Sequence, residues 1–335
     1  MAQVSILGAG SWGIALATVL LDNNHQVTLW EFDREAADRL NQLREEPDKL
    51  PGITLPDSVT ITSDLDAAVG DAQFLLLAVP AQIMRQVAEQ LAGLRCEAEA
   101  LVLLAKGIEV RSLKRMSEVM TEVLGQEFSS RLCAVSGPSH AEEVARSQPT
   151  SVVAAGADSQ TVESVQQLLS TGSFRVYSST DLVGVELGGA LKNVVALAAG
   201  ILHGLELGDN TMGALLTRGL AEISRLGNCL GAQAETFAGL SGLGDLVTTA
   251  ASRHSRNRYV GERIGRGEKL PQILKSMKMV AEGVETTRAA VRLAARWEVE
   301  MPITEQVHEV LFNGKPPLEA ISDLMSRELK REVYS

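Results

Sequence analysis

The sequence predicts an α/β protein in which an N-terminal, doubly wound sheet is followed by an all-helical C-terminal domain. Short apolar runs alternate with amphipathic segments over the first half of the chain, as is typical of a mostly parallel sheet covered by helices. From residue 183 onward the apolar positions recur at helical spacing. A length of 335 residues suits two domains, and we expect them to comprise residues 1–180 and 181–335.

The expected strands are continuous apolar runs, which are typical of strands buried on both faces of a sheet. They lie at residues 4–7, 26–30, 59–62, 74–79, 100–104, 132–135, 151–155 and 174–177. Helices are expected between them and throughout the second domain, notably at residues 14–21, 82–94, 112–124, 162–169, 183–207, 212–230, 256–266, 283–297, 303–312 and 317–329. The stretch 44–56 is rich in charge and proline, and we expect it to be an exposed insertion.

Composition and charge exclude several classes of binding partner and indicate where the protein is located. The formal net charge is −11 without any dense run of Lys and Arg, which argues against nucleic acid or an anionic membrane as the main partner. The first residues lack the basic region of a signal peptide, and the apolar stretch at 194–202 is too short to span a bilayer. The 3 cysteines and 5 histidines have no metal-ligand spacing, so we expect a cytoplasmic protein with reduced thiols and no metal.

Three glycines follow the first expected strand. Gly8, Gly10 and Gly13 have G-x-G-x-x-G spacing and lead directly into a helix-compatible run. At this spacing the first glycine allows a tight turn, the second lets backbone amides approach a pyrophosphate, and the third lets the helix pack closely on the strand. The helix N-terminus then presents unpaired N–H groups to the phosphates. Glycines alone also mark structural turns, but the strand, helix and second strand together indicate a Rossmann-like dinucleotide site.

Two carboxylates follow the second expected strand. Glu31 and Asp33 lie about 20 residues beyond the last glycine, where an acid accepts hydrogen bonds from the adenosine ribose. The sequence leaves open which of them meets the ribose. Either acid would repel the 2′-phosphate of NADP, whereas Arg34 could attract it by swinging over the phosphate. We therefore expect NAD or NADP as cofactor, with a preference for NADH.

Two polar stretches follow later strands, at the sheet edge where doubly wound folds bind ligands. Lys106 ends one strand, and residues 136–141 (SGPSHA) follow the next. Each also has a plain structural interpretation, because a strand-end lysine is often a surface charge and a serine before a helix is often an N-cap.

Lys192 and Asn193 are the strongly polar side chains of an otherwise small and apolar helix at residues 188–200. Burial of a lysine is costly without partners and lowers its pKa, and a lysine near neutrality can exchange a proton with a substrate hydroxyl. The alternative is a lysine whose ammonium reaches the surface.

Two final stretches, GLGDLVTT at 242–249 and SRHSRNRY at 252–259, carry further candidates. Ser255 is suited to cap a helix, which would place Arg256 and Asn257 in its first turn. Exposed amides and a guanidinium there would form a phosphate site. The alternative is an exposed, basic start of a helix.

Taken in order, the stretches GAGSWG, AKGIE, SGPSHA, ALKNVVALAAGI, GLGDLVTT and SRNRYVG closely resemble those of bacterial NAD(P)-dependent glycerol-3-phosphate dehydrogenases. The resemblance runs from Ile6 to beyond Glu282. It implies reduction of dihydroxyacetone phosphate to sn-glycerol 3-phosphate for glycerophospholipid synthesis, by a homodimer with a dinucleotide domain and a helical domain.

The resemblance also implies roles for individual residues. Lys192 corresponds to the catalytic acid/base. The implied substrate-binding residues are Lys106, Gly137, Ser139, Lys192, Asp245, Ser255, Arg256 and Asn257. The implied cofactor contacts, beyond Gly8, Gly10, Gly13, Glu31 and Asp33, are Ser11, Trp12, Phe32, Lys106, Ala141, Arg256, Val280 and Glu282.

One departure and two alternatives accompany this resemblance. Many members carry a basic residue just after the second strand, where this chain has Glu31, Phe32 and Asp33. A β-hydroxyacid dehydrogenase also pairs a Rossmann domain with helices, but its helical Lys and Asn lie about one turn apart rather than adjacent. A catalytically silent NAD(P)-binding sensor would not need Lys192, Asp245 and the Arg256–Asn257 pair all together.

Overall fold

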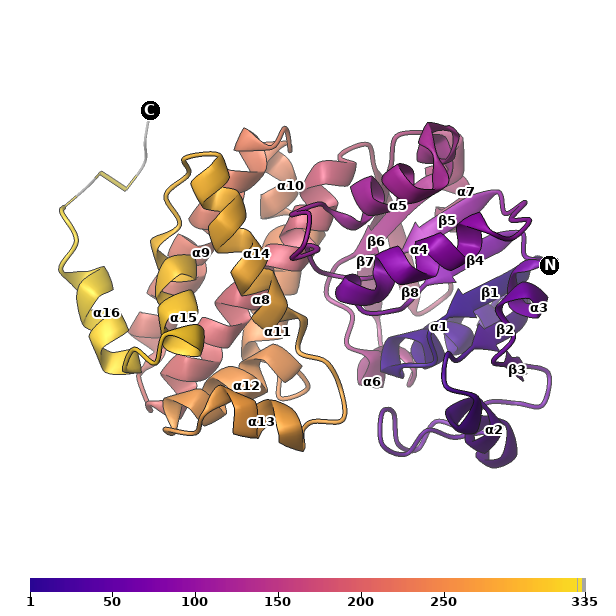
Figure 1. Cartoon of the computed structure of the whole chain (residues 1–335), viewed down its shortest axis with the longest axis horizontal. Coiled ribbons are helices and arrows are strands. Elements are labelled where there is room, and N and C mark those ends of the chain that lie inside the picture. The colour runs from indigo at the N-terminus through magenta and orange to yellow at the C-terminus, as the bar shows by residue number, and fades with distance from the viewer. Residues whose placement is uncertain (330, 333–335) are drawn as a thin grey trace.

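The computed structural model describes residues 1–329 and 331–332, which form two parts that lie side by side (Figure 1). The N-terminal part is built on one sheet of eight strands. The strands are β1 (Gln3–Leu7), β2 (Gln26–Trp30), β3 (Thr60–Thr62), β4 (Phe74–Leu77), β5 (Ala100–Leu103), β6 (Leu132–Ser136), β7 (Thr150–Gly156) and β8 (Phe174–Ser179). Each strand overlaps a run expected from the sequence, so the expectation of an α/β fold is confirmed.

The strand order β3-β2-β1-β4-β5-β6-β7-β8 determines where ligands bind. All neighbouring strands are parallel except β6 and β7, which confirms the mostly parallel sheet. The chain moves outward from β1 to β3 and then returns to place β4 beside β1. Doubly wound sheets bind ligands at such a switch point, beyond the carboxyl ends of the strands.

Helices cover both faces of the sheet because its buried strands present apolar side chains alternately to each side. On β4, Phe74 and Leu76 contact one core cluster, and Leu75 and Leu77 contact the other. The helices on the first face are α1 (Ser11–Asp22), α2 (Arg34–Leu43), α6 (Ala141–Val144) and α7 (Ser159–Leu169). Those on the second face are α3 (Leu65–Val69), η1 (Ala81–Ile83), α4 (Met84–Ala92), α5 (Met116–Leu124) and, at its edge, η2 (Gln126–Arg131).

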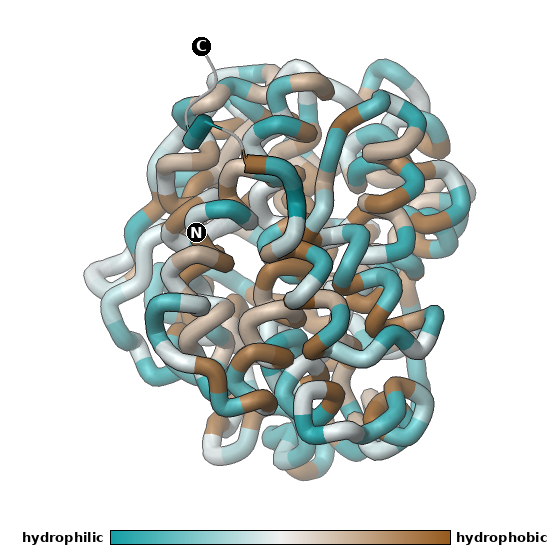
Figure 2. The backbone as a smooth tube through the Cα atoms, turned by 90° about the vertical axis from the view of Figure 1, so that its left-hand side faces the viewer, coloured by the Kyte–Doolittle hydropathy of each residue, from teal (hydrophilic) through white to brown (hydrophobic). Residues whose placement is uncertain are grey.

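The second part contains helices and no strand among the residues described after Ser179. Its central element is α8 (Leu182–Gly204), whose residues contact the two helical core clusters. Around it lie α9 (Asp209–Cys229), α10 (Ala234–Ala238), the π-helical turn η3 (Leu240–Gly244), α11 (Asp245–Ala251), α12 (Arg256–Gly265), α13 (Leu270–Ser276), α14 (Glu282–Arg296), α15 (Pro302–Phe312) and α16 (Pro317–Met325). Viewed from this end of the molecule, apolar and polar stretches alternate along the chain, as amphipathic packing requires (Figure 2).

Two expectations need correction. The helix expected from residue 112 begins at Met116, because residues before it form a turn closed by the Ile108–Arg115 bridge. The stretch 44–56 is not simply exposed, since Leu50 and Leu55 are buried in the first core cluster. Its polar composition suggested an insertion, but its few apolar residues anchor it beside the glycine loop.

Within the part of the chain that the structure describes, one helix, α8, is long and apolar enough to cross a membrane by length and composition. In its most apolar window, however, 94% of the residues are buried inside the structure. Its apolar character is therefore accounted for by packing, as expected for the central helix of a bundle.

The crossing of α8 and α12 depends on glycines, because the two backbones nearly touch. A Cβ atom on Gly261 of α12 would lie 2.0 Å from the carbonyl oxygen of Leu197. This close approach brings the N-terminus of α12, with Arg256 and Asn257, beside the part of α8 that carries Lys192.

We expect Gly261→Ala to destabilise the protein, because the added methyl group must push two helix backbones apart. The expected loss in the free energy of unfolding is about 1–3 kcal/mol, measured by urea denaturation. Gly213 of α9 is the matched control, since a Cβ atom there would meet nothing within 4 Å. Gly213→Ala should leave stability unchanged or raise it by about 0.5–1 kcal/mol. Equal effects of the two substitutions would contradict close packing at the crossing.

Candidate active site

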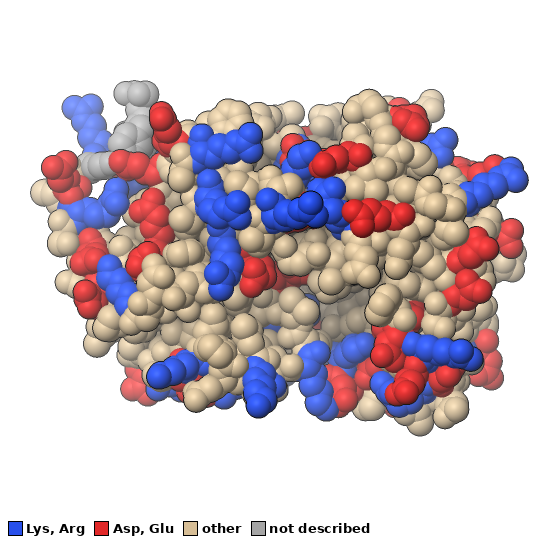
Figure 3. Space-filling model, in the orientation of Figure 1, with Lys and Arg blue, Asp and Glu red and all other residues tan. Residues whose placement is uncertain are grey.

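A cleft of about 480 Å³ runs between the two parts of the molecule, over the carboxyl ends of β1 and β4. In the space-filling view it is the hollow near the middle of the face, and charges of both signs surround it (Figure 3). Most of the candidate residues line this cleft: Gly8, Gly10, Ser11, Trp12, Glu31, Phe32, Lys106, Ser139, Ala141, Lys192, Asp245, Ser255, Arg256, Asn257, Val280 and Glu282. The fold thus gathers residues from both ends of the chain at one place.

Three candidates do not line the cleft. Gly13 lies behind the loop, where a Cβ atom would be 2.0 Å from the carbonyl oxygen of Gly8. Gly137 lies behind Lys106 and accepts a hydrogen bond from its ammonium. Asp33 is the N-cap of α2, with its exposed carboxylate accepting a hydrogen bond from the backbone N–H of Ala36 at 2.8 Å. Of the two acids expected at the ribose, Glu31 is therefore the one that faces the cleft.

The glycine loop has the geometry needed to cradle a pyrophosphate. Gly8 has a φ of +115°, a conformation that other residues rarely adopt, and it lies against the backbone of Ala78. A Cβ atom on Gly10 would meet nothing within 4 Å, so the backbone is open to the cleft there. α1 begins at Ser11 with its unpaired amides at this opening. A dinucleotide therefore fits this part of the cleft.

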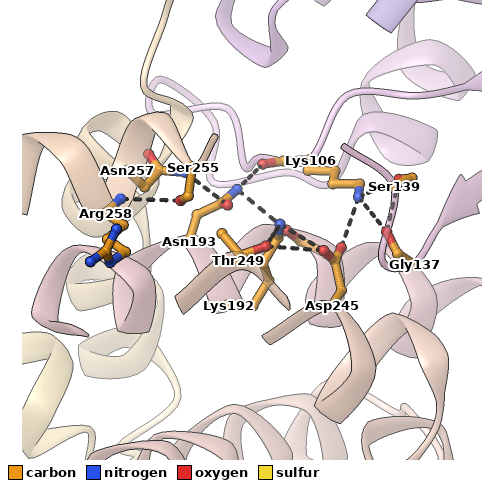
Figure 4. A network of polar contacts seen from close by, with 11 residues as sticks. Lys106, Gly137, Ser139, Lys192, Asn193, Asp245, Thr249, Ser255, Asn257 and Arg258 are labelled. Carbon is orange, nitrogen blue, oxygen red and sulfur yellow. Dashed lines mark hydrogen bonds and ion pairs between the residues drawn. The ribbon is translucent and has the colours of Figure 1, made fainter. Parts of the chain in front are cut away.

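The centre of the cleft is an ion cluster that joins the two parts of the molecule (Figure 4). Asp245 is buried at the start of α11, and its two oxygens accept from Lys192 at 2.9 Å and from Lys106 at 2.8 Å. Lys192 also donates to the Thr249 hydroxyl at 2.6 Å, and Lys106 donates to the Gly137 carbonyl at 2.8 Å. Two ammonium groups share one carboxylate, so the cluster has an excess positive charge.

Lys192 is buried, with only 5% of its surface exposed, which excludes the alternative of an ammonium at the surface. Burial is the main cause that lowers the pKa of Lys192 to about 8. Asp245 opposes this shift, and the charges of Lys106 and Arg256 contribute to it. At this pKa the side chain is mostly an ammonium at neutral pH, yet it can release its proton readily.

A chain of amide groups connects the cluster to α12 and α14. Asn193 donates to the backbone carbonyl of Lys106 at 2.9 Å and accepts from the Asn257 side chain at 2.9 Å. The side-chain oxygen of Asn257 in turn accepts a hydrogen bond from the backbone N–H of Gly283 at 2.9 Å. These bonds engage the side-chain oxygen and one of the two N–H groups of Asn257, so the side chain positions neighbouring elements. That its amide also binds the substrate phosphate stays a prediction.

Arg256 lies in the first turn of α12 and lines the cleft. Ser255 is the N-cap of this helix and accepts from the backbone N–H of Arg258 at 3.2 Å, which confirms the predicted cap. Among the described residues, no hydrogen bond or ion pair engages the Arg256 guanidinium. Its free donors and the first backbone amides of α12 point to an anion site at this end of the cleft.

Glu282, the first residue of α14, bonds to η1 in the N-terminal part. Its carboxylate accepts from the backbone N–H of Ala81 at 3.0 Å, and burial raises its pKa. Met279 of the preceding segment lies 3.5 Å from the Ser11 hydroxyl. The segment with Val280 therefore closes over the glycine loop in this structure.

Sequence reasoning assigned no role to Asn193, Thr249 or Lys49, although all three line the cleft. A polar residue beside Lys192 and the second threonine of the GLGDLVTT stretch were the available signals for the first two. Among the described residues no group of three or more His, Cys, Asp or Glu side chains could hold a metal ion.

The two parts of the chain match the two domains of one known family. Residues 3–162 match the family described as NAD-dependent glycerol-3-phosphate dehydrogenase N-terminus, and residues 181–322 match the corresponding C-terminus. The chain belongs to the NAD-dependent glycerol-3-phosphate dehydrogenase family. The resemblance drawn from the sequence motifs is thereby confirmed.

Individual relatives cover nearly the whole chain. It is 49% identical to a glycerol-3-phosphate dehydrogenase [NAD(P)+] of Prosthecochloris aestuarii over 98% of this chain and 99% of the relative. It is 50% identical to the enzyme of that name from Carboxydothermus hydrogenoformans, over 99% and 98%. The crystal structure of glycerol-3-phosphate dehydrogenase from Coxiella burnetii is similar with a TM-score of 0.92, at 35% identity over 97% of this chain and 99% of that chain.

Proposed function

We propose that this chain reduces dihydroxyacetone phosphate to sn-glycerol 3-phosphate with NADH or NADPH, and so supplies glycerophospholipid synthesis. The observation that carries the proposal is the buried Lys192–Asp245–Lys106 cluster, which lies between a glycine loop and an unpaired arginine in one cleft. The proposal takes residues 1–180 as the dinucleotide-binding domain and residues 181–335, the last few of which lie outside the described residues, as the substrate-binding and catalytic domain. Each domain also contributes contacts to the ligand of the other.

When bound, the reduced nicotinamide supplies the hydride for the carbonyl carbon of the substrate. The carbonyl oxygen then gains negative charge, which the Lys192 ammonium stabilises before giving its proton to that oxygen. The ketone thus takes up one hydride and one proton and becomes the alcohol, and Lys192 is left as a neutral amine. In the reverse direction the neutral amine accepts the proton from the alcohol.

Asp245 and Lys106 keep Lys192 suited to this exchange. Asp245 favours the ammonium form and holds it at 2.9 Å, whereas Lys106 brings a second positive charge that eases proton release. Because Asp245 bonds both lysines, it also positions the side chain from the sheet against the side chain from α8. Preorganised charges of this kind stabilise an oxyanion without rearranging during the reaction.

The remaining residues would bind the two ligands. The proposed cofactor contacts are Gly8, Gly10, Ser11, Trp12, Glu31, Phe32, Ala141, Val280 and Glu282, with Lys106 and Arg256 shared with the substrate. The phosphate would lie at Arg256 and the N-terminus of α12, which keeps the carbonyl near Lys192. Ser139 would contact the substrate beside Lys106, to which its hydroxyl lies at 3.3 Å.

The pH dependence of both reaction directions follows from the lowered pKa of Lys192. Reduction requires the ammonium, so its kcat/KM should be constant below about pH 8 and fall as pH rises through that value. Oxidation of sn-glycerol 3-phosphate requires the neutral amine, so its kcat/KM should rise through the same region and then level off. Initial rates over a range of pH at saturating cofactor measure both profiles. Parallel profiles in the two directions would exclude proton exchange at Lys192.

Purified protein tests the proposed function directly. NADH or NADPH should be oxidised only when dihydroxyacetone phosphate is added, and chiral analysis should identify sn-glycerol 3-phosphate as the product. Oxidation with β-keto acids instead would favour a β-hydroxyacid dehydrogenase. Cofactor binding without any oxidation would favour the silent sensor.

We also propose that the enzyme works as a homodimer in the cytoplasm. The family resemblance supports the dimer, and the three free cysteines are compatible with a reducing compartment. Light scattering of the purified protein should give twice the chain mass of 35.8 kDa. A particle of single chain mass at working concentration would exclude the dimer.

A further inference from the structure

A lysine from the segment after α2 faces the cleft beside the end of β2. The Lys49 ammonium lies 3.5 Å from the Glu31 carboxylate and 3.5 Å from the backbone carbonyl of Ala9 in the glycine loop. In a Rossmann-like domain the adenosine ribose lies between this loop and the acid after the second strand. Lys49 therefore occupies the position at which a ribose substituent would be recognised.

The fold holds Lys49 in place. Leu50 is fully buried in the core cluster under the sheet, and the Leu50 backbone N–H donates to the Glu46 carbonyl at 2.8 Å. The Lys49 side chain is 28% exposed, so it is partly sheltered but still reachable from the cleft. Its ion pairs with Glu31 and Glu46 are long, at 3.5 Å and 3.7 Å. Loose pairs of this kind exchange partners at little cost.

The other cations near the ribose end are less suited to this position. Arg34 lies in the first turn of α2, is exposed and does not line the cleft. Lys278 lines the cleft but is 67% exposed and is paired with Asp48 at 2.6 Å. Lys49 is the cation that combines contact with Glu31, contact with the glycine loop and a buried anchor.

We propose that the Glu31–Lys49 pair determines cofactor choice and allows the enzyme to use both NADH and NADPH. This inference rests on the proposed function. With NADH, Glu31 accepts hydrogen bonds from the ribose hydroxyls while Lys49 neutralises the carboxylate. With NADPH, the Lys49 ammonium leaves its ion pair with Glu31 and pairs with the 2′-phosphate. The expectation that Arg34 would offset the carboxylates is replaced by this assignment.

Direct binding tests the proposal without depending on turnover. Dissociation constants of NADH and NADPH are measured by titration calorimetry for the wild type, Lys49→Met, Lys49→Arg and Glu31→Gln. Lys49→Met should raise the ratio of the NADPH constant to the NADH constant by at least about tenfold, the effect of one lost charge-assisted bond. Lys49→Arg should keep the wild-type ratio within about threefold, because the charge remains. Glu31→Gln should lower the ratio, because it removes the repulsion of the phosphate.

Arg34→Met and Lys278→Met are the matched control variants, and each should leave the ratio within about twofold of the wild type. An unchanged ratio in Lys49→Met, or a larger change in either control, would overturn the assignment of Lys49. Failure of the wild type to bind either cofactor would instead overturn the proposed function. The ratio is insensitive to a general loss of folded protein, since both cofactors are measured on the same preparation.

Discussion

Replacing Lys192 with alanine is expected to lower the turnover of dihydroxyacetone phosphate by at least about 100-fold, the scale of a lost acid/base group. The loss arises because the substitution removes the ammonium that Asp245 and Thr249 hold in the cleft as the proposed proton donor. Cofactor binding should stay near that of the wild type, since the glycine loop and Glu31 are untouched. Steady-state rates together with NADH titrations measure the two effects separately.

A lysine outside the cleft is the control for this substitution. Lys275 of α13 is exposed and has no ion pair or hydrogen bond among the described residues, so Lys275→Ala should keep wild-type turnover. Turnover near that of the wild type in a folded Lys192→Ala variant would remove Lys192 from the mechanism.

Replacing Arg256 with alanine is expected to raise the KM for dihydroxyacetone phosphate about 10- to 150-fold, which corresponds to about 1.5–3 kcal/mol for charge-assisted bonds. The reason is that the Arg256 guanidinium lines the cleft and makes no hydrogen bond to any residue that the structure describes. For unphosphorylated dihydroxyacetone, a poor substrate, kcat/KM should change much less, because that molecule has no phosphate to lose contact with.

Arg266 lies just after the other end of α12 and provides the comparison. It is 61% exposed and paired with Glu262, so Arg266→Ala should leave the KM of both substrates unchanged. Equal losses with dihydroxyacetone phosphate and dihydroxyacetone in Arg256→Ala would place the phosphate elsewhere in the cleft.

Local patterns were sufficient to predict most of the fold and the main cleft residues. The strands are apolar runs, and the glycine spacing predicts where the backbone makes a tight turn and exposes its amides to a phosphate. Ser255 was predicted as an N-cap because capping depends on residues only three positions apart. Lys192 was singled out because one charge in an apolar helix is unusual.

Contacts between distant residues could not be predicted in the same way. Lys106 and Asp245 bond each other although 139 positions separate them, and nothing local to either residue indicates that pairing. Lys49 was overlooked because the charge and proline around it are typical of exposed loops, while its position depends on the burial of Leu50. Asp33 stayed a candidate for the ribose beside Glu31 because the start of α2, which it caps, was not anticipated.

Chemical rescue of Lys192→Ala by added amines tests the central claim, that the Lys192 ammonium supplies the proton, most directly. The substitution removes the side chain beyond Cβ from a cleft that small solutes can enter, so propylammonium can occupy the vacated space. We predict that the turnover of the variant rises with the concentration of propylammonium and rises less with the bulkier tert-butylammonium, while the wild type is unaffected. A variant that keeps its residual rate at every amine concentration, with NADH binding intact, would contradict the claim.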